Sequence, residues 1–343
     1  MESVILQLPK ALLPWYKKNH RPLPWREDKD PYHIWLSEIM LQQTRVEAVR
    51  GYYVRFLAIL PTIQDLANAD DELLHKLWEG LGYYSRVRNL KKAAQVICRD
   101  YDGTFPQEYK DVLSLPGIGA YTAGAICSIA FNKPTPAVDG NVLRVVARLT
   151  DDDTPVDTAD FKTQTQRLLS AVYPENAADF TQAIMELGAT VCGPNRSPDC
   201  AACPCNGFCK GKYRATELPV RLPKRGKREE ERTVFVVSCN GRYALTKRPE
   251  KGLLAGMWQF PDVSGNFSGQ SAIDRAYELS FAINNLIYEV EKVHIFTHIR
   301  WKMRGIYLQA SKETDGYEWL TAEEIRTRVA LPTAYRQFFN EEL

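Results

Sequence analysis

The chain has no long apolar run. None of its 343 residues lies in a segment approaching the roughly 18 consecutive apolar residues that a membrane-spanning helix requires. Its start lacks the basic residues and uninterrupted apolar stretch of a secretory leader, because it carries Glu2, Pro9 and Pro14. We therefore expect a cytoplasmic protein that does not enter a membrane and whose thiols stay reduced.

An excess of charge of one sign is also missing. The 44 Lys and Arg residues nearly balance 42 Asp and Glu residues, for a net charge of +2 and a pI near 8.0. Any surface for a polyanion must therefore be local. There is no internal repeat and no low-complexity tract. A length of 343 residues exceeds that of one ordinary core and predicts two domains.

The first 210 residues have a helical pattern. Apolar residues recur at intervals of three and four, and Pro or Gly separates the segments. The predicted helical segments are 34–60, 71–81, 87–101, 120–131 and 180–192. This periodicity predicts an all-α domain over residues 1–215.

The composition changes after that point. Residues 216–232, TELPVRLPKRGKREEER, combine two prolines and dense charge with little to bury, which is typical of a linker. Beyond it, 233–239, 242–248, 287–296 and 298–310 have the residue types of strands, and 270–283 and 333–343 look helical. Residues 233–343 are therefore predicted to form a small α+β domain.

The segment LPGIGAYTAGAI, residues 115–126, contains the clearest local motif. Gly117 and Gly119 bracket one apolar residue directly before a helix. Backbone N–H groups at such a helix start, together with the helix dipole, suit a phosphate. An ordinary turn between two helices is an equally good interpretation of these residues alone.

Several segments together resemble a known family. LPGIGAYT (115–122) is similar to the hairpin of the helix-hairpin-helix DNA glycosylases, and AVDGNVLRV (137–145) to their catalytic-aspartate segment. With LPWR (23–26), WLSEIMLQQTRV (35–46) and GLGYYSRVRNL (80–90), the resemblance is to MutY-type adenine DNA glycosylases. It implies an all-α glycosylase domain with an iron–sulfur cluster loop at 192–209, followed by a small Nudix-like α+β domain.

The resemblance also implies an activity and a partner. The family hydrolyses the N-glycosidic bond of adenine mispaired with 8-oxoguanine, or with guanine, in double-stranded DNA. We expect a monomeric base excision repair enzyme, and the compact length of the chain favours a bacterial, nucleoid-associated protein over a nuclear one.

Two carboxylates are candidates for the chemistry. Glu38 lies beside apolar Ile34 and Leu41 on a predicted helix, where desolvation would keep it protonated. By itself it would be a boundary residue, but the resemblance implies that it protonates adenine N7. Asp139 precedes a helical run and is typical of an N-cap. The resemblance gives it a second role, stabilising the oxocarbenium-like sugar.

Tyr121 separates two branches of the superfamily. The related endonuclease III enzymes carry a lysine there, which forms a Schiff base and leads to strand cleavage. Tyrosine cannot form one, so the resemblance implies a monofunctional glycosylase. A bifunctional glycosylase/lyase, a non-catalytic DNA-damage binder and a Nudix-type hydrolase are the alternatives. The last is opposed by the absence of an R-E-x-x-E-E signature in the sequence.

Further site residues follow from the resemblance. Those implied to contact the 8-oxoguanine side are Gln42, Gln43, Thr44, Leu81, Tyr83, Phe296, Thr297 and His298, and those implied to line the adenine pocket are Arg21, Trp25, Arg26 and Gln182. Leu81 and Trp25 are also typical core residues. Gln182 replaces a glutamate, and Thr297 a serine, of other members. Gly117, Gly119, Arg86 and Arg88 are the candidate phosphate contacts, although charge runs are often plain surface.

Five of the eight cysteines fall within residues 192–209. Four thiolates suit zinc or an iron–sulfur cluster. The resemblance implies a [4Fe–4S] cluster on Cys192, Cys200, Cys203 and Cys209, with one residue more than usual in the first gap, and leaves Cys205 as a non-ligand. The cluster would hold a DNA-facing loop containing Asn195 and Arg196.

Overall fold

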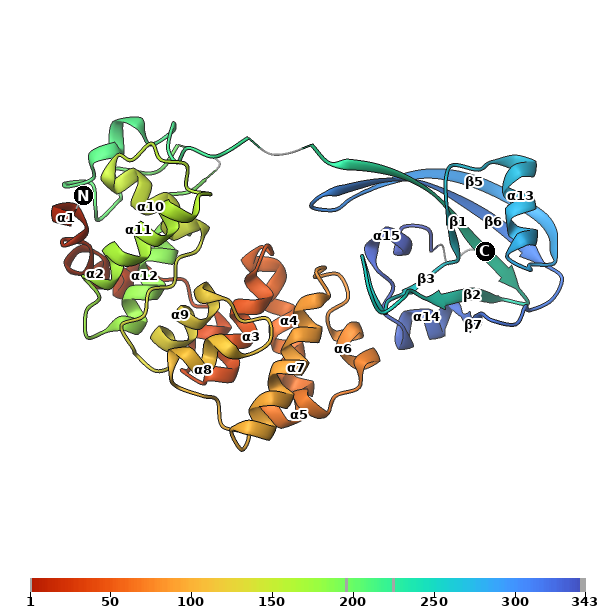
Figure 1. Ribbon diagram of the computed structural model, residues 1–343, viewed down its shortest axis with the longest axis horizontal. Coiled ribbons are helices and arrows are strands. Elements are labelled where there is room, and N and C mark those ends of the chain that lie inside the picture. Colours follow the sequence, from red (N-terminus) through yellow and green to blue (C-terminus); the bar gives the residue numbers. More distant parts are fainter. Residues whose placement is uncertain (1, 195–196, 224–225, 340–343) are drawn as a thin grey trace. The chain divides into compact units, whose positions relative to one another are not determined.

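The computed structural model describes residues 2–194, 197–223 and 226–339. The chain divides into two compact units (Figure 1). The first contains residues 1–68 and 89–223, and the second contains residues 69–88 and 224–343. Among the described residues, no helix has both the length and the apolar character needed to cross a bilayer. Asn195 and Arg196 lie outside the described residues.

The first unit is helical, as the apolar periodicity predicts. Its elements are α1 (Glu2–Ile5), α2 (Leu8–Asn19), η1 (Pro24–Arg26), α3 (Pro31–Leu41), α4 (Val46–Ile59), α5 (Ile63–Asn68), α8 (Tyr109–Ser114), α9 (Ala120–Ile129), α10 (Gly140–Thr150), α11 (Ala159–Ser170), α12 (Ala177–Thr190) and η2 (Lys210–Arg214). Helix α7 (Ser85–Asp100) begins in the second unit and ends in the first.

The predicted helical segment 34–60 is interrupted in the structure. Helix α3 ends at Leu41, and α4 begins at Val46. Between them Gln43 has a positive φ of 56°, which a continuous helix does not allow. The turn therefore places residues 42–44 at the end of α3 instead of along one long helix.

A glycine hairpin joins α8 to α9. Gly117 has a φ of +77°, and a Cβ there would lie 2.6 Å from Cβ of Asn89 on α7. Both the backbone conformation and this close approach require glycine. Gly119 is the exposed N-cap residue of α9, and the first backbone N–H groups of a helix have no partner within the helix.

Helices α2, α10 and α12 pack together around one core cluster of the first unit. Val142, Val145, Val146 and Leu149 supply the α10 side of this core. Gly188 of α12 allows Asn141 to approach, since a Cβ at Gly188 would lie 2.6 Å from Cβ of Asn141. The N-terminus of α10 is therefore held against α12.

The second unit is built on a sheet with the order β3-β2-β1-β6-β5, to which β4 and β7 add at β1 and β2. The strands are β1 (Arg228–Cys239), β2 (Arg242–Lys247), β3 (Trp258–Gln259), β4 (Asp262–Ser264), β5 (Ile283–Ile295), β6 (Ile299–Ala310) and β7 (Glu318–Thr321). The helices are α6 (Asp71–Leu77), α13 (Gly269–Glu278), α14 (Ala322–Arg328) and α15 (Thr333–Arg336). This confirms the predicted α+β class.

Alternating residues of β1 divide between the two faces of the sheet. Val234 and Val236 belong to the core cluster that contains Tyr335 of α15, while Phe235 and Val237 belong to the cluster that contains Ala272 of α13. Strand β1 begins at Arg228, inside the predicted linker, and pairs in parallel with β6. Its charged start is matched across the ladder, where Glu229 forms ion pairs with Arg300 and Lys302 at 3.5 and 2.7 Å.

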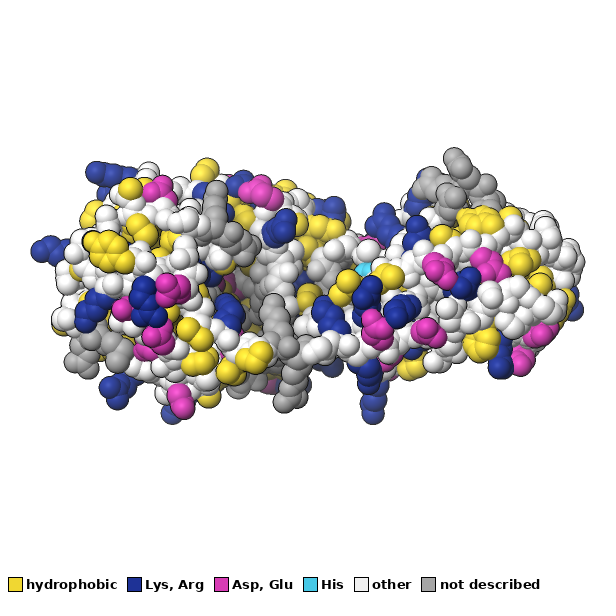
Figure 2. Space-filling view, turned by 90° about the horizontal axis from the view of Figure 1, so that it is seen from above, with side chains coloured by type: hydrophobic (Ala, Val, Ile, Leu, Met, Phe, Trp, Pro, Cys, Tyr) yellow, Lys and Arg dark blue, Asp and Glu magenta, His cyan; other side chains and the backbone are white. Residues whose placement is uncertain are grey.

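Residues 69–88 belong to the second unit although they lie early in the sequence. Lys76 Nζ donates to the carbonyl of Val329 at 3.0 Å, and Glu79 Oε1 accepts from the backbone N–H of Leu331 at 3.0 Å. On the face drawn in Figure 2, basic side chains are interspersed with acidic and apolar ones in both units. This mixture agrees with the small net charge of the chain.

Candidate active site and cysteine cluster

A cavity of about 340 Å³ lies within the helical unit. Its wall comes from the loop 21–26 and from helices α3, α9, α10 and α12. It gathers the following residues that the sequence analysis singles out: Arg21, Trp25, Arg26, Glu38, Gln42, Gln43, Thr44, Tyr121, Asp139 and Gln182. Residues distant in sequence thus meet in one pocket, which fits a binding or catalytic site.

Glu38 projects into this pocket from the buried face of α3. Only 7% of the residue is exposed. Burial raises the pKa of its carboxyl to about 7, and the negative charge of Asp139 acts in the same direction, whereas the Tyr121 hydrogen bond and the charge of Arg26 oppose it. The carboxyl is therefore able to hold a proton near neutral pH and to donate it.

The Tyr121 hydroxyl, from α9, donates a hydrogen bond to Glu38 Oε2. Burial, followed by the nearby carboxylates, raises the pKa of this phenol well above its ordinary value of 10.0. Tyr121 therefore stays protonated and fixes one oxygen of Glu38, which leaves the other oxygen for a substrate.

Asp139 is the N-cap residue of α10. Its Oδ1 accepts from the backbone N–H of Val142 at 2.7 Å, and its Oδ2 accepts from Nδ2 of Asn141 at 2.7 Å. Burial raises the pKa of its carboxyl, and these hydrogen bonds oppose that rise. The cap thus holds a second carboxylate rigidly in the same pocket as Glu38.

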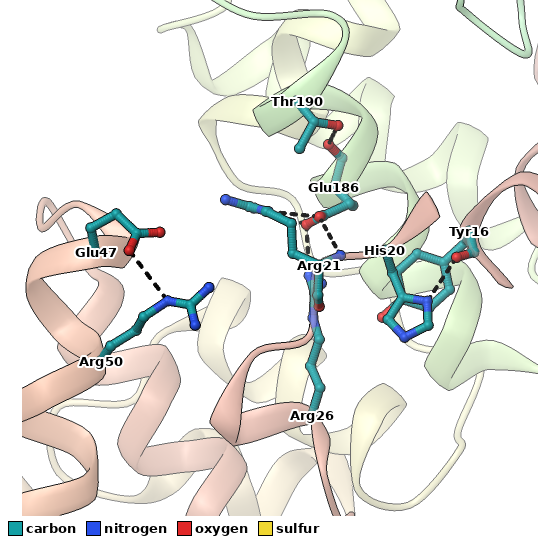
Figure 3. A network of polar contacts seen from close by, with 8 residues as sticks. All are labelled: Tyr16, His20, Arg21, Arg26, Glu47, Arg50, Glu186 and Thr190. Carbon is teal, nitrogen blue, oxygen red and sulfur yellow. Dashed lines mark hydrogen bonds and ion pairs between the residues drawn. The ribbon is translucent and has the colours of Figure 1, made fainter. Parts of the chain in front are cut away.

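Glu186 is a site residue that is not among those predicted from the sequence. It lies on α12, one turn after Gln182, and its side chain is 1% exposed. Its carboxylate accepts from Nε and Nη2 of Arg21 at 2.7 and 2.9 Å and from Nη2 of Arg26 at 2.8 Å (Figure 3). Its position one helical turn after Gln182, a predicted site residue, was the available signal.

The remaining pocket residues contribute a polar rim and an aromatic wall. Gln42 Nε2 donates to Thr122 Oγ1 at 3.3 Å, and Thr44 Oγ1 donates to the carbonyl of Gln42 at 3.3 Å. Gln43 is exposed. Trp25 is buried and meets the ring of Tyr53 edge to face, with centroids 5.5 Å apart, so it serves both core and pocket.

The other predicted recognition residues lie in the second unit. Tyr83 is 44% exposed, has a φ of 49°, and its hydroxyl lies 2.8 Å from Oγ1 of Thr297. Thr297 and His298 are exposed in the tight connection from β5 to β6, whereas Phe296 packs edge to face on Trp301 with centroids 4.8 Å apart.

Leu81, Arg86 and Arg88 are more enclosed. Leu81 is buried. Arg86 is also buried, and its Nη2 donates to the carbonyls of Leu81 and Gly82, both at 3.1 Å. Nη1 of Arg88 donates to the carbonyl of Ala255 at 2.7 Å. The buried position of Arg86 does not favour the predicted phosphate contact, because backbone acceptors already hold its guanidinium inside the protein.

The five clustered cysteines line one small cavity of about 20 Å³. Cys205 is fully buried there, and the predicted ligands Cys192, Cys200, Cys203 and Cys209 are partly buried. Arg148, which is buried, donates from Nη1 to Sγ of Cys192 at 3.2 Å. Within the described ranges, no three Cys, His, Asp or Glu side chains already stand in a metal-binding arrangement. The donor set, five thiols with a cation beside them, nonetheless fits a thiolate-bound cluster.

Hydrogen bonds connect the cysteine segment to the pocket. Asn141, which donates to Asp139, accepts from Nη2 of Arg144 at 2.8 Å. Nε of Arg144 donates to the carbonyl of Cys192 at 2.9 Å. The start of the cysteine loop and the cap of α10 therefore share one buried arginine.

A glycine hairpin, a capped aspartate and a buried glutamate in one helical unit are the features through which the chain resembles the helix-hairpin-helix base excision glycosylases. Residues 36–174 match the family model of the HhH-GPD superfamily base excision DNA repair proteins, and residues 233–341 match that of the NUDIX domain. A solved thermostable thymine-DNA glycosylase is 27% identical with a TM-score of 0.56, covering 62% of this chain and 97% of that chain. A solved endonuclease III–DNA complex, 21% identical with a TM-score of 0.54, covering 63% of this chain and 99% of that chain, shares the fold.

The adenine DNA glycosylases of Rattus norvegicus and Homo sapiens are each 34% identical to this chain over 96% of its length, covering 77% and 72% of the relatives. That of Arabidopsis thaliana is 36% identical over 88% of this chain, which spans 57% of that relative. The chain belongs to the adenine DNA glycosylases, base excision repair enzymes that remove adenine from DNA. The predicted family and enzyme class are confirmed.

Proposed function

We propose that this chain hydrolyses the N-glycosidic bond of adenine mispaired with 8-oxoguanine, or with guanine, in duplex DNA. The observation that carries the proposal is the pairing of two carboxylates in one pocket. Glu38 has a pKa near neutrality, and Asp139 is held by a helix cap. Cleavage of a glycosidic bond requires one carboxylic acid that donates a proton to the leaving group and one ionised carboxylate that stabilises the sugar.

The residues divide the work as follows. An adenine flipped out of the duplex enters the pocket, at an unstacking penalty of a few kcal/mol. Glu38 donates its proton to N7 of the base, which becomes a better leaving group as the bond from the sugar to N9 breaks. Asp139 stabilises the positive charge that develops on the sugar, and water completes the hydrolysis. Tyr121 holds Glu38 in position throughout.

Strand cleavage is not part of the proposed reaction. A lyase of this superfamily uses a lysine amine at the hairpin, and this chain carries Tyr121 there. A phenol cannot form a Schiff base with the abasic sugar. We therefore expect borohydride to trap no high yield of protein–DNA adduct.

Residues of the second unit support the proposed specificity for 8-oxoguanine opposite adenine. In the second unit, Tyr83 and Thr297 form a hydrogen-bonded pair at an exposed position. The hydroxyl groups of these residues provide donors and acceptors for a purine edge, and the tyrosine ring provides a stacking surface. Phe296 anchors this connection to the core through Trp301.

Cys192, Cys200, Cys203 and Cys209 are the proposed ligands of a [4Fe–4S] cluster. When bound, such a cluster would act as a structural crosslink of the loop rather than as a reagent at adenine. Cys205 is the most buried of the five thiols and packs in the core formed by α10 and α12, which favours a structural role. Arg148 would supply positive charge beside the thiolates.

The direct test is a single-turnover assay on duplexes carrying A:8-oxoguanine, A:G and A:C, followed by alkali. We expect cleavage at A:8-oxoguanine and A:G, and loss of excision with retained duplex binding in Glu38→Gln and Asp139→Asn. Normal excision by both variants would overturn the assigned roles. Binding without excision by the unsubstituted chain would favour the non-catalytic binder instead.

A further inference from the structure

A cluster of ion pairs around the buried Glu186 lies in the pocket wall and has no role in the proposed chemistry. Glu186 accepts from three donors of Arg21, its backbone N–H at 3.1 Å, Nε at 2.7 Å and Nη2 at 2.9 Å. It also accepts from Nη2 of Arg26 at 2.8 Å. Both carboxylate oxygens are therefore occupied by arginines (Figure 3), and Glu186 acts on the pocket through them.

The two arginines are fixed relative to each other as well. Nη1 of Arg26 donates to the carbonyl of Arg21 at 3.1 Å, and the Arg26 guanidinium lies 5.6 Å from the ring centroid of Tyr16. These bonds join the loop 21–26 to helix α12. Because both elements line the cavity, Glu186 fixes the shape of one wall and the place of two positive charges.

The positive charge of Arg26 affects the protonation of Glu38. Arg26 favours the ionised form of Glu38, which opposes its function as a proton donor. A carboxylate bonded to Arg26 offsets the field of this arginine at Glu38. The Glu186 side chain is only 1% exposed and that of Arg26 12%, so little solvent screens the interaction between these two charges.

We propose that Glu186 is a positioning residue for adenine excision, which holds Arg21 and Arg26 in the pocket wall and offsets their charge so that Glu38 remains a proton donor. The inference rests on the proposed function, because it concerns the proton that Glu38 donates. The bonds to Glu186 hold the guanidinium groups of Arg21 and Arg26 in the pocket wall, and its negative charge reduces the effect of their positive charge on Glu38.

Charged and titratable groups from several elements surround the carboxyls of Glu38 and Glu186. Glu38 is faced by Tyr121 of α9, Asp139 at the start of α10, and Arg26 of the loop. Glu186 is faced by the two arginines and, from α2, by Tyr16. The two arginines hold the pKa of Glu186 at about 2 against the opposing effect of burial, so Glu186 stays ionised through the range in which Glu38 titrates.

The test is the pH profile of single-turnover excision on an A:8-oxoguanine duplex. Glu186→Gln keeps the shape but removes the charge, so the alkaline limb, which follows deprotonation of Glu38, should move to lower pH by about half a unit to one unit. Above the midpoint the rate should fall about three- to tenfold. Arg21→Gln should move the limb the opposite way, because Glu186 then offsets Arg26 alone.

Two control variants accompany the test. Glu108→Gln removes an exposed carboxylate that is paired with Lys133 at 2.7 Å outside the pocket, and should leave the midpoint unchanged. Glu186→Asp keeps the negative charge, so the midpoint of its alkaline limb should stay close to that of the wild type. A lowered rate with an unmoved midpoint in both Glu186→Gln and Arg21→Gln would overturn the inference. Absence of excision by the unsubstituted chain would instead overturn the proposed function.

If Glu186→Gln does not fold, as judged by its melting temperature, Arg21→Gln carries the test alone. A midpoint that moves to higher pH supports the inference, and one that stays or moves to lower pH refutes it. Duplex binding is measured alongside, so that a change in affinity is separated from a change in the acid.

Discussion

The burial of Glu38 should lower the stability of the protein in a way that depends on pH. Its carboxyl has a pKa of about 7 in the folded chain and 4.5 in an ordinary glutamate. Below 4.5 both folded and unfolded states hold the proton. Between 4.5 and 7 the unfolded state releases it first, so stability falls as pH rises, and the loss is complete above 7.

The magnitude follows from the same values. At about 1.4 kcal/mol for each pKa unit, the rise from 4.5 to about 7 corresponds to about 3 kcal/mol. Glu38→Gln removes the titration and keeps an acceptor for Tyr121. The difference in unfolding free energy between variant and wild type should therefore grow in favour of the variant by about 3 kcal/mol from pH 4 to about pH 8.5.

Urea unfolding followed by circular dichroism at several pH values measures this difference. Far-ultraviolet helical signal reports chiefly on the helical unit, which contains Glu38. Glu47→Gln, an exposed position on α4, is the matched control and should show little change with pH. A difference for Glu38→Gln that stays constant from pH 4 to 8.5 would refute the assignment of a neutral, buried carboxyl.

Further outcomes follow from the same contacts. Tyr121→Phe removes the hydrogen bond that lowers the pKa of Glu38, so the alkaline limb of the excision profile should move to higher pH; a shift to lower pH would contradict this. Asp139→Asn should abolish excision with little change in melting temperature, because asparagine also caps helices, whereas Asp139→Ala should in addition lose about 1 kcal/mol of stability. Cys205→Ser should retain iron, measured by absorbance and metal analysis; loss of iron from this variant alone would assign Cys205 as a ligand. Arg86→Met should lower the melting temperature through the loss of two buried hydrogen bonds, and an unchanged value would show that those bonds contribute little.

The sequence predicts elements well where the signal is local. Apolar periodicity indicates the helices of the first unit, and the alternation of Ile299, Trp301 and Met303 with charged residues indicates strand β6. The hairpin at Gly117 and Gly119 is likewise a local signal. Such patterns depend on a few neighbouring residues and are visible without any knowledge of the fold.

Non-local contacts are where prediction fails. Nothing near residue 186 reveals that its carboxylate meets arginines 160 and 165 positions away. The charged residues at the start of β1 are typical of a linker in the sequence, but in the structure Glu229 forms ion pairs with Arg300 and Lys302 of β6. Pairing across the fold decides each case.

The attachment of residues 69–88 to the second unit has a practical consequence for dissecting the protein. Removing everything after residue 223 would delete the carbonyl that accepts from Lys76 and the N–H that donates to Glu79. Helix α6 would keep its covalent neighbours but lose its packing partners, and Thr297 would no longer hold Tyr83. Loss of activity in such a truncated chain would therefore not measure recognition by the missing domain alone, since a segment encoded in the retained half loses its support at the same time.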